Sequence, residues 1–226
     1  MCVQFWERRS LPDTFVDNDV VLKLCRFGRL ADLAGCLEQR GSDLRVLGSL
    51  RFKIWPMVAS DAGMNAALTA FLGEVSEVEP SDADILLAAQ IEEAAQRMGH
   101  AVDDGESILF AMAIAQAAQV ATGDKRAVQG LAAIAGDVPA CMALSGTILT
   151  MEWLASTLVL RHGVDTIRDA VCATPKVDRA MEICFQCSRD SCTSDDICAA
   201  LASYQRDLAR QTKGFVTADL PTAVGA

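Results

Sequence analysis

Short apolar segments alternate with helical segments along the chain, and this alternation constrains the fold more than any other feature of the sequence. The apolar segments cover residues 14–17 (TFVD), 44–47 (LRVL), 120–122 (VAT) and 139–144 (PACMAL). Short strands separated by helices are typical of a parallel sheet with helices packed against its faces. We therefore predict an α/β fold, a three-layer α/β/α sandwich built around a short parallel sheet.

The helical segments have recognisable starts and stops. Asn18 or Asp19 is expected to cap a helix through VVLKLCRF that Gly28 ends, and Gly41 is expected to close the next helix. Pro56 is expected to stop the helix or turn SLRFKIWPM, because proline has no backbone N–H to donate. Further helices are predicted over residues 61–71, 81–98, 125–135 and 147–162.

The central stretch DDGESILFAMAIAQAAQVATGDKRAV, residues 103–128, predicts a helix, a buried strand and a second helix. Asp103 and Glu106 have the D-x-x-E spacing of a capping box at the first helix. Gly123 and Asp124 form a tight turn from the strand into the second helix. A carboxylate at a helix start and another at the carboxyl end of a strand share one rim of a parallel sheet, where open α/β folds place their sites.

Length and pattern predict two units. A chain of 226 residues is long enough for one sizeable core plus a helical addition. All four predicted strands precede residue 164, and only helices are expected after it. We therefore predict a sheet-containing domain over residues 1–163 and a helical C-terminal extension over residues 164–226, with a loose tail, KGFVTADLPTAVGA.

Charge and targeting signals narrow the class of protein. The formal net charge of −10 argues against broad non-specific nucleic-acid binding, although it allows a local basic cleft and suits a basic protein partner. The N-terminal MCVQFWERRS is unlike a signal peptide, and no apolar run has the length of a membrane span. We predict a cytoplasmic protein that has no membrane partner.

The nine cysteines are expected to be reduced in that compartment, and their odd number and scattered spacing argue against a disulfide framework. Four of them lie close together in CFQCSRDSCTSDDIC: Cys184, Cys187, Cys192 and Cys198. Four thiolates suffice for a structural zinc, but cysteines in predicted helices also behave as small buried hydrophobes. Both interpretations stay open, with the hydrophobic one favoured.

Asp17, Glu106 and Asp124 are each predicted at the carboxyl edge of a strand or at the start of a helix. Carboxylates that converge repel one another unless a cation neutralises them, and Mg²⁺ or Mn²⁺ prefers such oxygen ligands. Such an ion can activate water and stabilise a phosphodiester during displacement. Asp19 either joins these metal ligands through a bridging water or only caps its helix. Helix capping is the competing interpretation for all of these acids.

Several motifs, in order, resemble those of PIN-domain nucleases over residues 14–160. VDNDVVLKL resembles the opening strand of that family, which ends in a D-T-N-V-L-type motif. DDGESILFAMAIA resembles the G-E-containing helix start of one PIN-like branch. ATGDKRAVQGLA and LSGTILTMEWL resemble that branch's T-x-D-K-x-A-R and G-T-x-G-I-L segments.

The resemblance implies an α/β/α sandwich and a metal-dependent endoribonuclease, as in the toxins of toxin–antitoxin pairs. By position, Asp17, Glu106 and Asp124 match the metal ligands of the family, and Mg²⁺ or Mn²⁺ is the implied cofactor. Lys125 and Arg126 stand beside Asp124, where they would steer a phosphate or would simply be solvated. The expected partners are RNA, an antitoxin or other protein, and a second copy of the chain in a homodimer.

Three positions depart from the family pattern, and they support other functions. Asp19 replaces an asparagine, Gly123 stands where many relatives carry an acid, and Lys53 stands where an acid is usual. The missing acids at Gly123 and Lys53 favour a degenerate module that binds RNA or protein without cutting. The D-x-D spacing of Asp17 and Asp19 also allows a haloacid-dehalogenase-like phosphatase, with the first as nucleophile and the second as acid and base.

Overall fold

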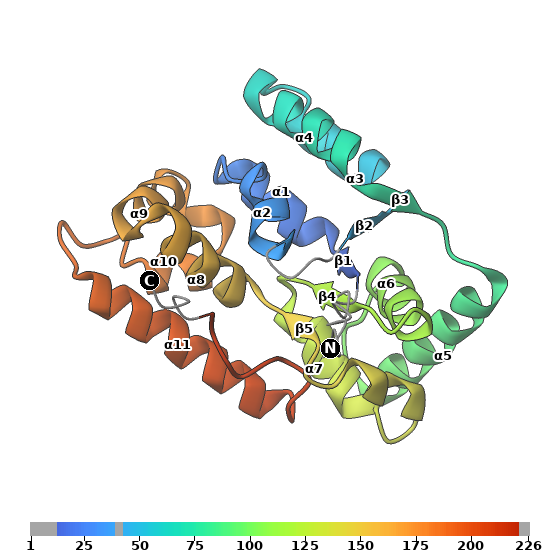
Figure 1. Ribbon diagram of the computed structural model, residues 1–226. Helices are drawn as coiled ribbons and strands as arrows, with labels where there is room; N and C mark the ends of the chain where they lie inside the picture. Colours follow the sequence, from blue (N-terminus) through green and yellow to red (C-terminus); the bar gives the residue numbers. More distant parts are fainter. Residues whose placement is uncertain (1–12, 39–42, 222–226) are drawn as a thin grey trace, which may run out of the picture.

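The computed structural model describes residues 13–38 and 43–221, which form an open sheet of five parallel strands with helices around it (Figure 1). The strand order is β3-β2-β1-β4-β5, so β1 lies at the centre between β2 and β4. The strands are β1 (Thr14–Val16), β2 (Leu44–Leu47), β3 (Ser76–Val78), β4 (Gln119–Ala121) and β5 (Ile148–Leu149). The predicted α/β class and parallel sheet are confirmed.

Helices connect the strands and continue past β5. Between β1 and β4 they are α1 (Asn18–Arg26), α2 (Asp32–Glu38), α3 (Leu50–Val58), α4 (Ala62–Glu74), α5 (Asp82–Met98) and α6 (Asp104–Ala115). Between β4 and β5 they are α7 (Lys125–Ile134) and the 3₁₀ helix η1 (Pro139–Leu144). After β5 they are α8 (Met151–His162), α9 (Val164–Ala173), the 3₁₀ helix η2 (Pro175–Val177), α10 (Arg179–Cys184) and α11 (Ser194–Gln211).

The two faces of the sheet pack against different helices. Successive side chains of a strand point to opposite faces, and in β1 Phe15 belongs to one buried cluster and Val16 to the other. Val120 and Ala121 of β4 divide in the same way. The cluster around Phe15 packs against α5, α6 and α7, and the cluster around Val16 packs against α1, α2 and α8. This arrangement is compatible with the predicted three-layer sandwich.

The prediction of a strand at PACMAL is wrong, because this segment forms the 3₁₀ helix η1. Pro139 stands in its first turn, and the buried Cys141 and Leu144 are three residues apart, which places them on one side of a 3₁₀ helix. The strand is instead Ile148–Leu149, inside the range predicted as helix, where it pairs with β4. Thr150 then caps α8 through the Trp153 amide, so the helix begins later than predicted.

Two further boundaries in the first half of the chain differ from prediction. Pro56 lies inside α3 rather than at its end, and its ring faces solvent, where water can satisfy the carbonyl that it leaves unpaired. The edge strand β3, which pairs with β2, was not predicted. Its sequence SEV is largely exposed and has no apolar run, so only its pairing makes it a strand.

The predicted helix ends agree with the structure better than the predicted strands do. Gly28 follows α1 with a positive φ of 66°, as expected of a helix stop, whereas the expected stop at Gly41 lies outside the described residues. Ser81 and Asp84 form a capping box at α5, close to the predicted start. The helix after β1 begins at Asn18 with Asp17 as its N-cap residue, so neither Asn18 nor Asp19 is the cap.

The chain after residue 164 is helical as expected, but part of its tail is built into the sheet edge. Phe215 and Val216 are buried, and Val216 forms a parallel bridge with Ile148 beside β5. The expectation of a loose tail is therefore wrong for this part, because two apolar side chains complete the core there. Residues of the extension, including Ile167 and Met181, share one buried cluster with Leu24 of α1.

The expectation that all thiols are reduced is also wrong, because Cys172 and Cys187 form a disulfide between α9 and the segment after α10. Cys187 is therefore not available as a zinc ligand. Cys184 is buried, and burial raises the pKa of its thiol to about 12, as expected of a core cysteine. Within the described part of the chain, no helix is both long enough and apolar enough to cross a membrane.

Candidate functional site

The acids singled out from the sequence surround one cavity of about 240 Å³, at the carboxyl ends of β1 and β4. Asp17 directly follows β1, Asp124 follows β4, and Glu106 comes from the first turn of α6. Hereafter the acidic cavity means the space lined by Asp17, Asn18, Asp19, Leu22, Lys53, Ile54, Met57, Asp103, Gly105, Glu106 and Asp124. The structure thus brings together side chains that are up to 107 positions apart, from Asp17 to Asp124.

Asp17 is the most deeply placed of these acids, with 9% of its surface exposed. It stands at the N-cap position of α1 but makes no side-chain cap bond. Instead, its Oδ2 accepts a 2.8 Å hydrogen bond from Thr122 Oγ1, which in turn accepts one from the Asp124 amide. Burial raises the pKa of Asp17 to about 6. The hydrogen bond from Thr122 opposes this rise, and the nearby charge of Asp19 adds to it.

Glu106 serves the predicted capping box. Its Oε2 accepts a 2.9 Å bond from the Asp103 amide, and Asp103 Oδ1 accepts a 2.8 Å bond from the Glu106 amide. Burial nevertheless raises the pKa of Glu106 to about 8, and the carboxylates of Asp103, Asp124 and Asp17 raise it further against the cap bond. The capping interpretation is confirmed, but it leaves Glu106 in an environment that disfavours its charge.

Asp124 behaves differently because cations and amides surround it. Its Oδ1 accepts bonds from the amides of Arg126 and Ala127, at 2.8 and 3.3 Å, and so caps α7. Its Oδ2 lies 3.0 Å from the Arg126 guanidinium. Burial alone would raise the pKa of Asp124, but the bonds from Arg126 and Ala127 outweigh it and hold the pKa below its usual value.

The space at Gly123 is taken by the carboxylate of Asp19. A Cβ at this glycine would overlap Asp19 Oδ2, and would lie 2.9 Å from Lys23 Nζ and 3.1 Å from Met151 Cγ. Asp19 does not cap α1, and its carboxylate is instead paired with Lys23 at 2.6 Å. An acid is therefore present beside Gly123, but it comes from α1.

Lys53 enters the acidic cavity from α3. Its Nζ lies 2.8 Å from the position that a Cβ on Gly105 would take, so this glycine makes room for the amino group next to Glu106. Among the described residues, no carboxylate lies within ion-pair distance of Lys53. Among the described residues that line the acidic cavity, Lys53 is the only basic one, and five are acidic.

Lys125 and Arg126 point in different directions. The Lys125 amino group forms an ion pair with Glu152, which is fully buried, and stands 5.1 Å from the ring centroid of Tyr204. Arg126 stays at the rim, with 78% of its side chain exposed. Arg126 is thus exposed beside Asp124, whereas the amino group of Lys125 is held by Glu152.

The donor set has the chemistry that a hard divalent cation prefers, since carboxylate oxygens dominate the wall of the acidic cavity. Glu106 keeps one carboxylate oxygen outside its capping-box bond. In residues 13–38 and 43–221, however, no three His, Cys, Asp or Glu side chains stand close enough together to form a ready ligand set. Placement and chemistry thus agree with a cation site, and the side chains would have to draw together around the ion.

Several residues of this region were missed from the sequence. The sequence indicates Thr122 only as the end of a strand, but its hydroxyl donates a hydrogen bond to Asp17. It indicates Asp103 only as a helix cap, but this residue also lines the acidic cavity. Glu152 is the ion-pair partner of Lys125, 27 positions away, and Asp178 is a partner of Lys23, 155 positions away. No local pattern reveals pairs so distant in sequence.

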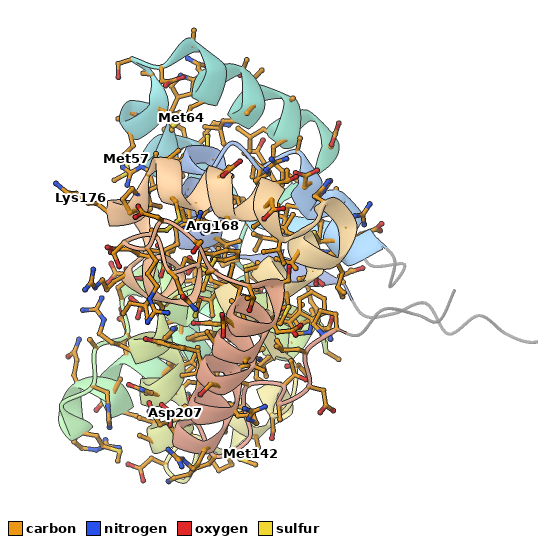
Figure 2. The ribbon with its side chains drawn as sticks, turned by 90° about the vertical axis from the view of Figure 1, so that its left-hand side faces the viewer. Met57, Met64, Met142, Arg168, Lys176 and Asp207 are labelled. Atoms are coloured by element: carbon orange, nitrogen blue, oxygen red, sulfur yellow. A yellow bond between two sulfur atoms is a disulfide. The ribbon has the colours of Figure 1, made fainter. Side chains whose placement is uncertain are left out.

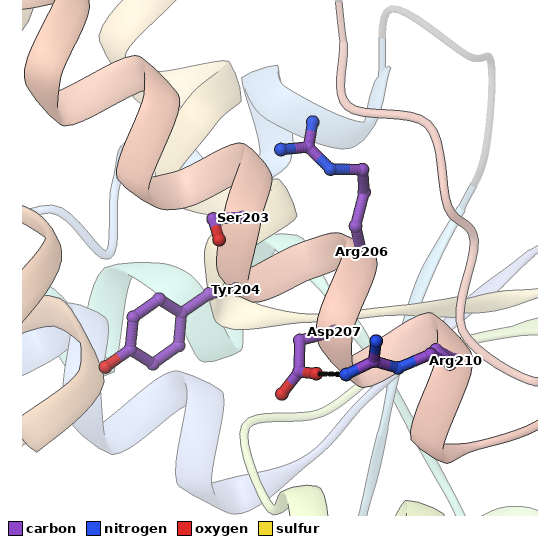
Figure 3. Close-up of a pocket in the computed structure, with 5 residues that line it drawn as sticks. All are labelled: Ser203, Tyr204, Arg206, Asp207 and Arg210. Atoms are coloured by element: carbon purple, nitrogen blue, oxygen red, sulfur yellow. Dashed lines mark hydrogen bonds and ion pairs between the residues drawn. The ribbon is translucent and has the colours of Figure 1, made fainter.

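A larger hollow of about 520 Å³ lies along α11 (Figure 3). It is lined by Ser203, Tyr204, Arg206, Asp207 and Arg210. Asp207 and Arg210 are paired on the helix surface, as the dashed line in Figure 3 shows. No buried acid lines this hollow among the described residues, so the acidic cavity is the better candidate site.

Comparisons of the chain with protein-family models, with curated proteins and with solved structures find no match.

Proposed function

We propose that this chain is a PIN-like endoribonuclease that uses a divalent cation, Mg²⁺ or Mn²⁺, to hydrolyse RNA phosphodiester bonds in the acidic cavity. One observation carries the proposal. Five acidic side chains from distant segments meet around one cavity, and the pKa values of Asp17 and Glu106 are raised there. Raised pKa values in a cleft are typical of functional groups, because folding gains nothing by crowding like charges.

Asp17 and Glu106 would hold the ion, with Asp124 and Asp19 at its side. When bound, the ion supplies a water of lowered pKa and neutralises charge that develops on the phosphate. The protein's part is to position these groups. Thr122 fixes the Asp17 carboxylate by its hydrogen bond, and the capping box fixes Glu106 at the start of α6.

Two cations of the chain would serve the substrate. The amino group of Lys53, free of any ion pair with the described carboxylates, would face a phosphate that enters the acidic cavity. Arg126 would contact the same phosphate at the rim, since most of its side chain is exposed. The carboxylate side of the site would thus bind the cation, and these two side chains would bind the negatively charged substrate.

The motif resemblance supports the choice of RNA and of a toxin role in the cytoplasm, with an antitoxin or other protein as partner. The observed architecture is compatible with what the resemblance implies, because the parallel sheet has helices on both faces, Asp17 and Asp124 follow its central strands, and Glu106 lies at the start of α6. The proposal predicts no broad affinity for nucleic acid, given the net charge of −10.

A second candidate is a binding module that holds RNA or protein without cutting. It is favoured by the guanidinium of Arg126 on Asp124 and by Lys53 in the acidic cavity, where each supplies positive charge that an ion would otherwise supply. The phosphatase alternative is weaker. Asp19, its acid and base, is already held in an ion pair by Lys23 at 2.6 Å.

The test is to incubate the protein with single-stranded RNA and Mn²⁺, and to measure Mn²⁺ binding by calorimetry. Asp17→Asn removes the charge but keeps an oxygen for the Thr122 bond, and Asp207→Asn on α11 is the matched control. The proposal predicts that Asp17→Asn abolishes both cleavage and Mn²⁺ binding while the control retains both. RNA that is bound by the wild type but never cleaved would establish the binding module instead.

A further inference from the structure

Lys53 carries the only positive charge among the described residues that line the acidic cavity. Its amino group forms no ion pair with a described carboxylate, although five acidic side chains line the same cavity. Lys23 and Lys125, in contrast, are each held by a carboxylate. The Lys53 amino group is therefore a cation in acidic surroundings that no single acid holds in place.

Gly105 makes room for this amino group. A Cβ at Gly105 would lie 2.8 Å from Lys53 Nζ and 3.3 Å from Asp103 Oδ1, so the amino group stands where a side chain would otherwise be. The backbone does not require glycine at this position, because Gly105 is helical and its φ is not positive. Glycine also destabilises a helix relative to alanine. The close approach of Lys53 is thus the feature of the structure that accounts for a glycine between Asp103 and Glu106.

Lys53 can leave the cavity without any change in the fold. Leu50, Ile54 and Val58 are the buried residues of α3, whereas Lys53 itself is exposed. Figure 1 shows α3 together with α4 at the outer edge of the molecule. A lysine side chain is a flexible stem, so rotation about its own bonds carries the amino group toward solvent or toward a ligand. The positive charge in the acidic cavity is therefore movable.

A movable cation changes what the acidic cavity binds. A divalent cation that enters meets the Lys53 amino group as a like charge, and repulsion over a few ångströms is strong enough to change an affinity about tenfold. A phosphate attracts the same amino group and neutralises it, which removes that repulsion. Each ligand therefore favours the binding of the other, and this coupling is reciprocal.

We infer that Lys53 is a built-in counterion of the acidic cavity: its amino group keeps the affinity for a divalent cation low until a substrate phosphate binds and neutralises it. This inference rests on the proposed function and adds a form of regulation to it. The free protein holds the cation weakly, and the substrate completes the cation site.

The test is calorimetric titration of the full chain with Mn²⁺, first alone and then with saturating uridine monophosphate. This nucleotide carries a phosphate but no diester to cleave, and a titration of Mn²⁺ into the nucleotide alone is subtracted. Without the nucleotide, Lys53→Met is expected to bind Mn²⁺ about tenfold more tightly than the wild type, whereas Lys53→Arg, which keeps the charge, binds it as the wild type does. The nucleotide is expected to tighten Mn²⁺ binding by the wild type about tenfold and to have a much smaller effect in Lys53→Met.

Lys213→Met is the matched control. Lys213 is also an exposed lysine, but it precedes Gly214, whose carbonyl accepts a hydrogen bond from the Gly146 amide at the amino end of β5. The acidic cavity lies at the opposite edge of the sheet, where β1 and β4 have their carboxyl ends. This variant is expected to bind Mn²⁺ as the wild type does. Matching circular-dichroism spectra of the variants exclude misfolding as the cause of a difference.

Three results would overturn the inference: Mn²⁺ binding by Lys53→Met that is no tighter than in the wild type, an equal gain in Lys213→Met, or an equal effect of the nucleotide on the wild type and Lys53→Met. Failure of the proposed function gives a different result. If Mn²⁺ and the nucleotide bind in the predicted way but RNA is never cleaved, the role of Lys53 stands and the nuclease activity is refuted.

Discussion

The acidic cavity adjoins a second cleft of about 350 Å³, the extension cleft, which is lined by Asp19, Lys23, Gly123, Asp124, Lys125, Arg126 and residues 177–180. The two hollows share Asp19 and Asp124, yet their acids are neutralised to different degrees. In the cleft, every acid has a cation beside it: Lys23 serves Asp19 and Asp178, and Arg126 serves Asp124. In the cavity, Asp17 and Glu106 form no ion pair with a described cation; hydrogen bonds, among them those from Thr122 and the Asp103 amide, hold them, and their pKa values rise.

This difference separates a structural use of charge from a functional one. Paired acids in the cleft hold α1, α7 and the extension together. The unpaired acids of the cavity oppose folding at neutral pH, and a cation or a proton is needed to relieve them. Stability measurements can therefore distinguish the two regions without any assay of activity.

The largest effect is expected at the ion pair between Lys125 and Glu152 beside the extension cleft. Lys125→Met leaves the fully buried carboxylate of Glu152 without its cation, and is expected to lower the free energy of unfolding by about 3 kcal/mol. Urea denaturation measures the loss. Lys176→Met, at an exposed lysine that projects from the surface in Figure 2, is the control and is expected to change little.

The double variant Lys125→Met/Glu152→Gln is expected to recover most of that loss, because it removes the orphaned charge. A loss below about 1 kcal/mol in Lys125→Met would mean that the pair is only a surface contact, and the contrast between the regions would fail.

The next effect is a fall in stability as the pH rises, caused by the cavity. Folding raises the pKa of Asp17 from 3.8 to about 6 and that of Glu106 from 4.5 to about 8. The folded state therefore binds more protons than the unfolded state between these values. The stabilisation is complete below the unfolded pKa and is lost as the pH rises through the folded one.

Asp17 alone is expected to lower the free energy of unfolding by about 1.4 kcal/mol between pH 5 and 7, and Glu106 adds a contribution that solvent screening reduces. Urea denaturation in EDTA at several pH values measures this slope. The Asp17→Asn variant is expected to flatten it. An unchanged slope in that variant would show that Asp17 titrates normally, and that the cavity does not destabilise the fold.

The smallest effect is expected at Asp103, which both caps α6 and crowds the cavity. Asp103→Ser keeps an N-cap oxygen but removes a negative charge that acts on Glu106 and Asp17. At pH 8 we expect a gain of a few tenths of a kcal/mol and a lower pKa of Glu106, measured by NMR titration. Thr193→Ser, in the capping box of α11, is expected to show no such gain. A clear loss of stability in Asp103→Ser would contradict the prediction.

The sequence was informative wherever the physics is local. The capping box of Asp103 and Glu106 and the stop at Gly28 depend on residues within one helical turn, and both were predicted correctly. The strands around Phe15 and Val120 were predicted because their apolar runs are long enough to mark burial on both faces. Asp17 and Asp124, which follow these strands, were expected on one rim of the sheet because the carboxyl ends of parallel strands lie on the same side.

Errors arose where distant segments decide the structure. Ile148 and Leu149 are a strand because β4 and Val216 lie beside them, whereas PACMAL, equally apolar, pairs with no strand of the described residues and forms a 3₁₀ helix. The disulfide of Cys172 and Cys187 depends on the packing of α9 against the segment after α10, which spacing alone did not reveal.

By itself, the sequence determined the parallel α/β class, the main helix ends and the acids that follow the central strands, because these depend on near neighbours and on burial patterns. Only the tertiary structure decided which acids remain unpaired. Lys23 reaches Asp178 across 155 positions, while Lys53 stands in the acidic cavity without forming an ion pair with any described carboxylate. Charge is screened, paired or buried according to its surroundings in space, and those surroundings exist only after the chain has folded.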